Sequence, residues 1–134
     1  MRVPWVHHGR DAATGLDCVG LVLAVYERVG LSLADMDVPY AEGDCRRRGA
    51  LLLRILDKRF KRIDAGGRFG PLDCESGDVL VLRSGTLFHV AIVVDGVVLE
   101  MAQKWPGSRN LRANGLNHKI WPFVDGVYRH RELL

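Results

Sequence analysis

The stretch DCVGLVLAVYERVG, residues 17–30, predicts the first helix of the chain over residues 18–29. Its apolar residues form a broad face, as expected for a helix that packs into a core. Asp17 is suited to cap the N-terminus of this helix, and Gly30 is suited to end it. Cys18 then lies in the first turn, where backbone N–H groups and the helix dipole stabilise a thiolate. The alternative for Cys18 is a small core residue at a helix start.

A second helix is predicted over residues 43–63, where apolar residues recur at helical spacing and basic residues occupy the other side. The second half of the chain changes to short apolar runs separated by turn signals. Asp95-Gly96 is a strong signal for a two-residue hairpin turn. The strands that this pattern predicts cover residues 79–83, 88–94 and 97–101, followed by an extended edge segment at 120–124 and a short strand at 126–129. Helices followed by antiparallel strands indicate an α+β fold.

The composition is that of one globular domain with a buried core. The chain has 134 residues, of which 48% are hydrophobic and 26% charged. No apolar run reaches the ~18 residues of a membrane span, and the N-terminus has no apolar region typical of a signal peptide. The net charge of +3 is too small for a nucleic-acid-binding surface. The basic excess, interpreted as a solvated helix face, lies at residues 129–131 and at Arg46, Arg47, Arg48, Arg54, Lys58, Arg59, Lys61 and Arg62.

The three cysteines, Cys18, Cys45 and Cys74, are widely spaced. Their spacing matches no zinc motif, so we expect no metal and no cofactor, and a zinc enzyme is the least favoured class. A disulfide framework is not expected either, because no secretory signal is present. Cys45 and Cys74 are interpreted as structural thiols, which leaves Cys18 as the candidate reactive cysteine.

A cysteine nucleophile needs a base held on rigid structure, and His89 opens the second predicted strand. A histidine in an apolar strand is otherwise a satisfied core or rim residue. With a two-residue turn at 95–96, Glu100 lies diagonally beside His89 on the same face of the hairpin. Glu100 could then orient the imidazole. Gln103 points to the opposite face in this register, and a β-bulge would reverse the choice.

Four segments resemble the motifs of one family. DCVGLV at residues 17–22 resembles the D-C-x-G-L-V nucleophile motif of the NlpC-type cell-wall cysteine peptidases, also called the NlpC/p-sixty family. GDVLVL at 77–82 resembles the G-D-[LV] strand entry of that family, and FHVAIV at 88–93 resembles its H-V-[GA]-I strand with the base histidine. PWVHHG at 4–9 is similar to its P-Y-x-x-G-G approach to the nucleophile. The motifs occur in the family's order over residues 3–103.

The resemblance implies one papain-like α+β domain over residues 1–134, with the nucleophile at a helix N-terminus packed on an antiparallel β-sheet. It implies that Cys18 attacks an amide in a peptidoglycan stem peptide, with His89 as base and Glu100 as the third polar residue. The backbone N–H of Cys18 would help to hold the oxyanion. The residues expected to contact the substrate are Trp5, His7, His8 and Asp17, although the histidine pair also fits a plain surface position.

Three positions depart from the family pattern. Glu100 stands where the family usually has His, Asn or Gln, Trp5 replaces a tyrosine, and Val19 replaces a serine. These departures keep open a structural tail-tip or assembly protein that retains the hydrolase fold. An amidase or acyltransferase that uses the same Cys–His pair is a weaker alternative.

The place of action follows as an expectation from the missing signal peptide and wall-binding module. A phage-borne family member fits these absences, so we expect a location in the virion tail or delivery to the bacterial periplasm. Tail-tip proteins are then expected partners, with the basic second helix as a docking element, and neither nucleic acid nor membrane insertion is expected.

Overall fold

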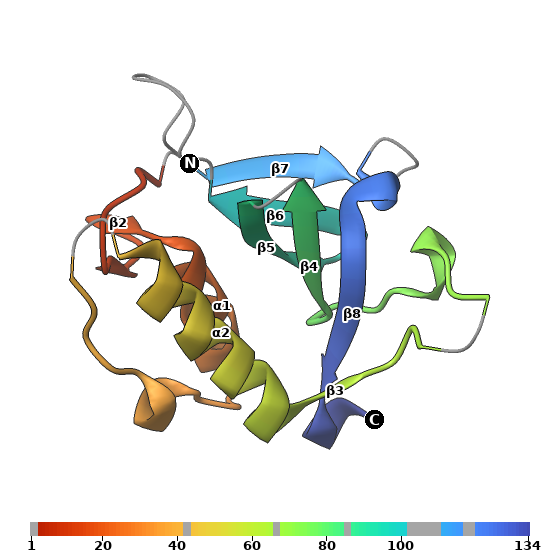
Figure 1. Cartoon of the computed structure of the whole chain (residues 1–134), viewed down its shortest axis with the longest axis horizontal. Helices are drawn as coiled ribbons and strands as arrows, with labels where there is room; N and C mark the ends of the chain where they lie inside the picture. The colour runs from red at the N-terminus through yellow and green to blue at the C-terminus, as the bar shows by residue number, and fades with distance from the viewer. Residues whose placement is uncertain (1–2, 42–43, 66–67, 85–86, 102–110, 117–119) are drawn as a thin grey trace. The chain divides into compact units, whose positions relative to one another are not determined.

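A computed structural model describes residues 3–41, 44–65, 68–84, 87–101, 111–116 and 120–134 (Figure 1). The chain divides into two compact units, Met1–Ile55 with Glu100–Arg112, and Leu56–Leu99 with Ala113–Leu134. The helices are α1 (Cys18–Arg28) and α2 (Cys45–Arg59), and the strands are β1 (Arg10–Asp11), β2 (Gly15–Leu16), β3 (Phe60–Arg62), β4 (Val79–Ser84), β5 (Leu87–Val94), β6 (Val97–Met101), β7 (Leu111–Gly115) and β8 (Val124–His130). Neither described helix has the length and apolar character needed to cross a membrane.

Helix α1 confirms the first prediction almost residue for residue. Asp17 is its N-cap, and the Asp17 side chain accepts a hydrogen bond from the backbone N–H of Gly20. The helix ends at Arg28, and Gly30 follows with a positive φ of 80°. Its fully or nearly buried residues include Val19, Val22 and Tyr26, as expected from the broad apolar face.

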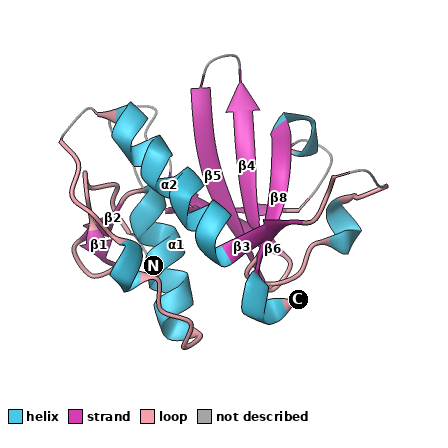
Figure 2. Cartoon of the chain, turned by 60° about the horizontal axis from the view of Figure 1, so that its bottom comes forward, coloured by secondary structure: helices cyan, strands magenta, loops and turns pink. Residues whose placement is uncertain are grey.

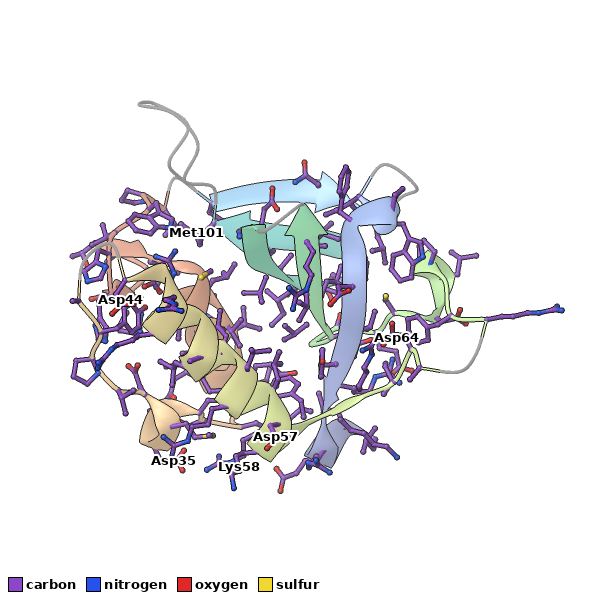
Figure 3. All side chains as sticks on the ribbon, in the orientation of Figure 1. Asp35, Asp44, Asp57, Lys58, Asp64 and Met101 are labelled. Atoms are coloured by element: carbon purple, nitrogen blue, oxygen red, sulfur yellow. The ribbon has the colours of Figure 1, made fainter. Side chains whose placement is uncertain are left out.

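Helix α2 is shorter than the sequence predicted. It begins at Cys45 and ends at Arg59, with Asp44 at its start and Asp57 and Lys58 near its other end (Figure 3). Residues 60–62 form β3 instead of a last helical turn, because Phe60 pairs with His130 of the neighbouring strand β8. The predicted apolar stripe is buried, at Leu51, Leu52, Ile55 and Leu56.

Within the described residues, the main sheet has six strands in the order β3-β8-β4-β5-β6-β7. Strands β5, β4 and β8 lie side by side in Figure 2, and the pairs β3–β8, β4–β8 and β4–β5 are antiparallel. The α+β class with two helices and an antiparallel sheet is therefore confirmed. The bounds of β4, β5 and β6 were predicted within one residue at each end. Asp95 and Gly96, with φ of 50° and 76°, form the expected two-residue turn.

The C-terminal prediction was wrong in part. Trp121–Phe123 form a single 3-10 turn and not an extended edge segment. The last strand exists but is longer than predicted, and it lies inside the sheet between β3 and β4. Strand β7 and the small β1–β2 hairpin were not predicted.

Arg129, counted from sequence among solvated basic residues, is instead largely buried. Its guanidinium donates 2.8 Å hydrogen bonds from Nε and Nη2 to the two carboxylate oxygens of Asp78, which is fully buried. Asp78 also accepts a hydrogen bond from the backbone N–H of Glu75. This bidentate ion pair fixes the entry into β4, which is the role of the Gly77-Asp78 segment in the fold.

Candidate active site

Cys18 is the first residue of α1 and is nearly buried, with 8% of its surface exposed. Burial raises the pKa of its thiol to about 11, and the charge of Asp17 raises it further. The charge of Arg48 and the backbone N–H groups of Val19 and Cys18 act in the opposite direction. The sequence-based expectation of a stabilised thiolate is therefore wrong in net effect, because desolvation outweighs the helix start.

The helix that carries Cys18 is anchored through Asp17. This carboxylate is fully buried and accepts hydrogen bonds from the backbone N–H of Gly20 at 2.8 Å and of His8 at 3.0 Å. It also accepts one from Arg10 Nη1 at 2.8 Å and one from the hydroxyl of Tyr40. Four internal donors occupy it, so a substrate contact by Asp17 would require these bonds to break.

Arg10 joins Asp17 to a second carboxylate. Its Nε and Nη2 donate to the two oxygens of Asp37 at 2.8 and 3.1 Å, and Nη2 also donates to the hydroxyl of Tyr40 at 3.0 Å. Burial raises the pKa of Tyr40, and its hydrogen bond to Asp17 adds to the increase. The phenol therefore stays protonated and remains a donor to Asp17. We call Arg10, Asp17, Asp37 and Tyr40 the cap cluster.

His7 and His8 pack on the cap cluster and are half-buried, so the plain surface interpretation of the pair is wrong. Their rings lie 5.5 and 4.9 Å from the ring of Tyr40. His7 Nε2 donates to the backbone carbonyl of Tyr40 at 3.1 Å, and His8 has a positive φ of 51° that directs its N–H to Asp17. Their predicted contact with substrate stays a prediction.

Gly20 has a steric role in the same region. A Cβ atom at Gly20 would come within 1.9 Å of the backbone carbonyl oxygen of Gly9. Only glycine permits this approach between the first turn of α1 and the segment that precedes β1. The glycine two residues after the candidate nucleophile is therefore needed for packing.

Trp5 is half-buried and lies close to the segment that leads into α1. It forms an isolated parallel bridge with Leu16, and the Arg48 guanidinium lies over its indole ring, 5.7 Å from the ring centroid. Its contact with substrate stays a prediction.

His89 lies in β5 and pairs with Leu82 of β4. The side chains of Leu82, Ala91 and Val93 belong to one buried cluster, so His89 lies on the sheet face that carries this cluster. His89 itself is half-buried and lies at the end of this row of side chains along β5. Cys18 and Glu100 belong to one compact unit, and His89 belongs to the other. The pairing of Cys18 with His89 and Glu100 stays a prediction, and Gln103 lies outside the described residues.

Sequence reasoning missed three members of the cap cluster: Arg10, Asp37 and Tyr40. Asp37 and Tyr40 lie 27 and 30 residues from Arg10, with no local periodicity to connect them. A signal for Arg10 did exist. Asp11 accepts a hydrogen bond from the N–H of Ala13 in a tight turn, and the hairpin that follows pairs Arg10 with Leu16, directly before Asp17.

Cys74 is a free, half-buried thiol whose pKa burial raises to about 11. Among the described residues, no three His, Cys, Asp or Glu side chains gather in a group that could hold a metal ion.

Comparison of the chain with protein-family models, with curated proteins and with solved structures gave no match.

Proposed function

We propose that the chain is a papain-like cysteine peptidase that hydrolyses amide bonds in peptidoglycan stem peptides. The observation that carries this proposal is the position of Cys18. It is the first residue of α1, directly after a buried N-cap, and the backbone N–H groups of Cys18 and Val19 act to lower the pKa of its thiol. A nucleophile at such a helix start has amide donors at hand for the oxyanion of a tetrahedral intermediate.

The raised pKa of Cys18 defines how the reaction must begin. With a pKa of about 11, roughly one thiol in ten thousand is ionised at pH 7. The nucleophile therefore needs a base at the moment of attack, and His89 is the proposed base. His89 accepts the thiol proton as the sulfur–carbon bond forms. It then protonates the leaving amine as the carbon–nitrogen bond breaks, and water hydrolyses the thioester to regenerate the thiol.

Glu100 is the proposed orienting group for His89. Val98 belongs to the same buried cluster as Ala91 and Val93, and Glu100 follows Val98 by two residues in β6. Side chains two residues apart in a strand point to the same face, which favours Glu100 for this role. A carboxylate in this position would hold the imidazole in one orientation and stabilise its charged form.

Carriage by a phage tail is part of the same proposal, in line with the phage-borne members that the chain resembles. Mass spectrometry of purified phage particles from a strain that encodes the chain tests it. Recovery of the protein with the tail supports the proposal, and its absence from the particles contradicts this part alone.

The activity is tested by digestion of purified peptidoglycan with the wild-type protein and with Cys18→Ala, with released muropeptides read by mass spectrometry. Cys74→Ser is the matched control, because Cys74 is also a free thiol with a pKa near 11 but lies far from α1 in sequence. We expect release by the wild type and by the control and none by Cys18→Ala. Equal release by all three proteins would contradict the assignment of Cys18.

One observation favours a second candidate function, a tail-tip or assembly protein with an inactive hydrolase fold. Cys18 is nearly buried, and its thiol pKa is raised and not lowered. Failure of the folded wild-type protein to cleave any of several wall types would favour this structural role over the peptidase.

A further inference from the structure

The N-cap of α1 carries a negative charge on the residue directly before the candidate nucleophile. Asp17 and Cys18 are consecutive, so their α-carbons lie only about 3.8 Å apart. The carboxylate of Asp17 is fully buried and is held over the first turn of the helix by the 2.8 Å hydrogen bond from the backbone N–H of Gly20. Cys18 is nearly buried as well. Little water therefore separates or screens this charge from the neighbouring sulfur.

The groups around Asp17 bind it as a carboxylate. Besides Gly20, the donors are the backbone N–H of His8, the guanidinium of Arg10 and the hydroxyl of Tyr40. Burial raises the pKa of the Tyr40 phenol, so this hydroxyl keeps its proton and remains a donor. Four donors, one of them a cation, thus hold a permanent negative charge at the start of α1.

A capping carboxylate and a thiolate compete for the same end of a helix. The free N–H groups and the helix dipole favour an anion there, but a second anion on the adjacent residue is repelled by the first. In agreement, the charge of Asp17 adds to burial in raising the pKa of the Cys18 thiol. Asparagine and serine cap helices about as well as aspartate. Capping by itself therefore does not explain a charged residue at this position.

We propose that Asp17 is a positioning residue that holds the resting Cys18 as a thiol, so that its sulfur becomes reactive only when a base takes the proton. This inference rests on the proposed function, in which Cys18 is the nucleophile and His89 is the base. A thiolate is the form that electrophiles and oxidants attack. The buried charge of Asp17 thus protects Cys18 from modification before a substrate arrives.

The test measures the rate at which iodoacetamide alkylates Cys18 at a fixed pH, with the modified peptide identified by mass spectrometry. Asp17→Asn removes the charge but keeps a side-chain oxygen for the N–H of Gly20. We expect this variant to react at least about fivefold faster than the wild type, the factor for two unit charges about 4 Å apart in water. Asp17→Ser, a second neutral cap, should show an increase of the same kind.

Asp37→Asn is the matched control. Asp37 is the other carboxylate that Arg10 binds, through hydrogen bonds of 2.8 and 3.1 Å, but it is not adjacent to Cys18 in the chain. The same substitution there weakens the same cap cluster and leaves the charge of Asp17 in place, so the rate should stay unchanged. A mere loosening of the fold would instead expose the thiol and accelerate alkylation in the variants of both aspartates.

Tyr40→Phe keeps the proposal testable even if the neutral caps do not fold. This variant removes one donor from Asp17 and keeps the carboxylate, so the repulsion of a thiolate is at least as strong and the rate should not rise. A faster reaction of Tyr40→Phe would overturn the inference. So would unchanged rates in folded Asp17→Asn and Asp17→Ser, or an equal acceleration in Asp37→Asn.

Alkylation involves no hydrolysis, so this test and that of the proposed function fail separately. Faster alkylation of Asp17→Asn by a protein that releases no muropeptides would support the role of Asp17 and contradict the peptidase. Release of muropeptides that depends on Cys18, with equal alkylation rates in the wild type and the neutral caps, would support the peptidase and overturn the role of Asp17.

Discussion

Arg10 Nη1 donates a 2.8 Å hydrogen bond to Asp17, the fully buried N-cap of the helix that begins with Cys18. The same guanidinium binds Asp37 through two further hydrogen bonds. A single side chain thus connects the candidate nucleophile's helix to a segment about twenty residues further along the chain. The position of Cys18 depends on this ion pair as well as on the helix itself.

Arg10→Met should destabilise the fold by about 3–5 kcal/mol, because it leaves the buried carboxylate of Asp17 without its cation. Asp17→Asn should also destabilise, although an asparagine can still cap the helix. The double variant should cost less than the sum of the two, since it removes both charges. Urea denaturation of the three variants measures the free energy of unfolding.

The matched control is the ion pair between Arg83 and Asp125, whose side chains are both about half exposed. Arg83→Met should cost at most about 1 kcal/mol. Equal losses for Arg10→Met and Arg83→Met would show that the buried pair contributes no more than a surface pair, contrary to this account.

Gly20→Ala should disturb the start of α1, because its Cβ would lie 1.9 Å from the carbonyl oxygen of Gly9. We expect a loss of several kcal/mol in unfolding free energy, or a folded protein with altered alkylation at Cys18. Gly96→Ala is the control, since the site is sterically open and only its φ of 76° is unfavourable, at a cost of about 1–2 kcal/mol. Similar thermal stabilities for the two variants would contradict the packing role of Gly20.

The raised pKa of Cys18 predicts a pH dependence of stability. Its value rises from 9.0 to about 11 on folding, so between these values the folded state keeps a proton that the unfolded state has lost. Stability is then unaffected below pH 9 and falls as the pH rises toward 11, by roughly 2–3 kcal/mol for this thiol. Cys18→Ala should show a smaller fall in urea midpoint over that range. An identical fall in both proteins would place the effect elsewhere, for example at Cys74.

Much of the fold was predictable where local signals agreed with the final structure. Asp17 and Gly30 delimit α1, and the turn at Asp95 and Gly96 sets the β5–β6 hairpin, because capping and turn chemistry act between neighbouring residues. The end of α2 was not predictable in this way. Phe60 continues the helical apolar stripe, but pairing with His130, seventy residues away, draws it into the sheet.

In the candidate site, too, the features set by neighbouring residues were predictable and those set by tertiary contacts were not. Cys18 and its cap were readable from consecutive residues, whereas the cap cluster joins residues 10, 17, 37 and 40 through tertiary contacts. The activation of Cys18 was also misjudged, since the helix start could be read from the sequence but the extent of burial could not. Burial depends on how the whole unit packs, and at this sulfur it has the larger effect.

The central claim, that His89 serves as base for Cys18, is tested most directly by the pH dependence of Cys18 alkylation with iodoacetamide in the wild type and in His89→Ala. With His89 as base, the wild type should react between pH 7 and 9 at least tenfold faster than His89→Ala. In His89→Ala the rate should rise about tenfold per pH unit until the pH approaches 11, as for a buried thiol alone. Superimposable profiles for the two proteins would contradict the Cys18–His89 pair.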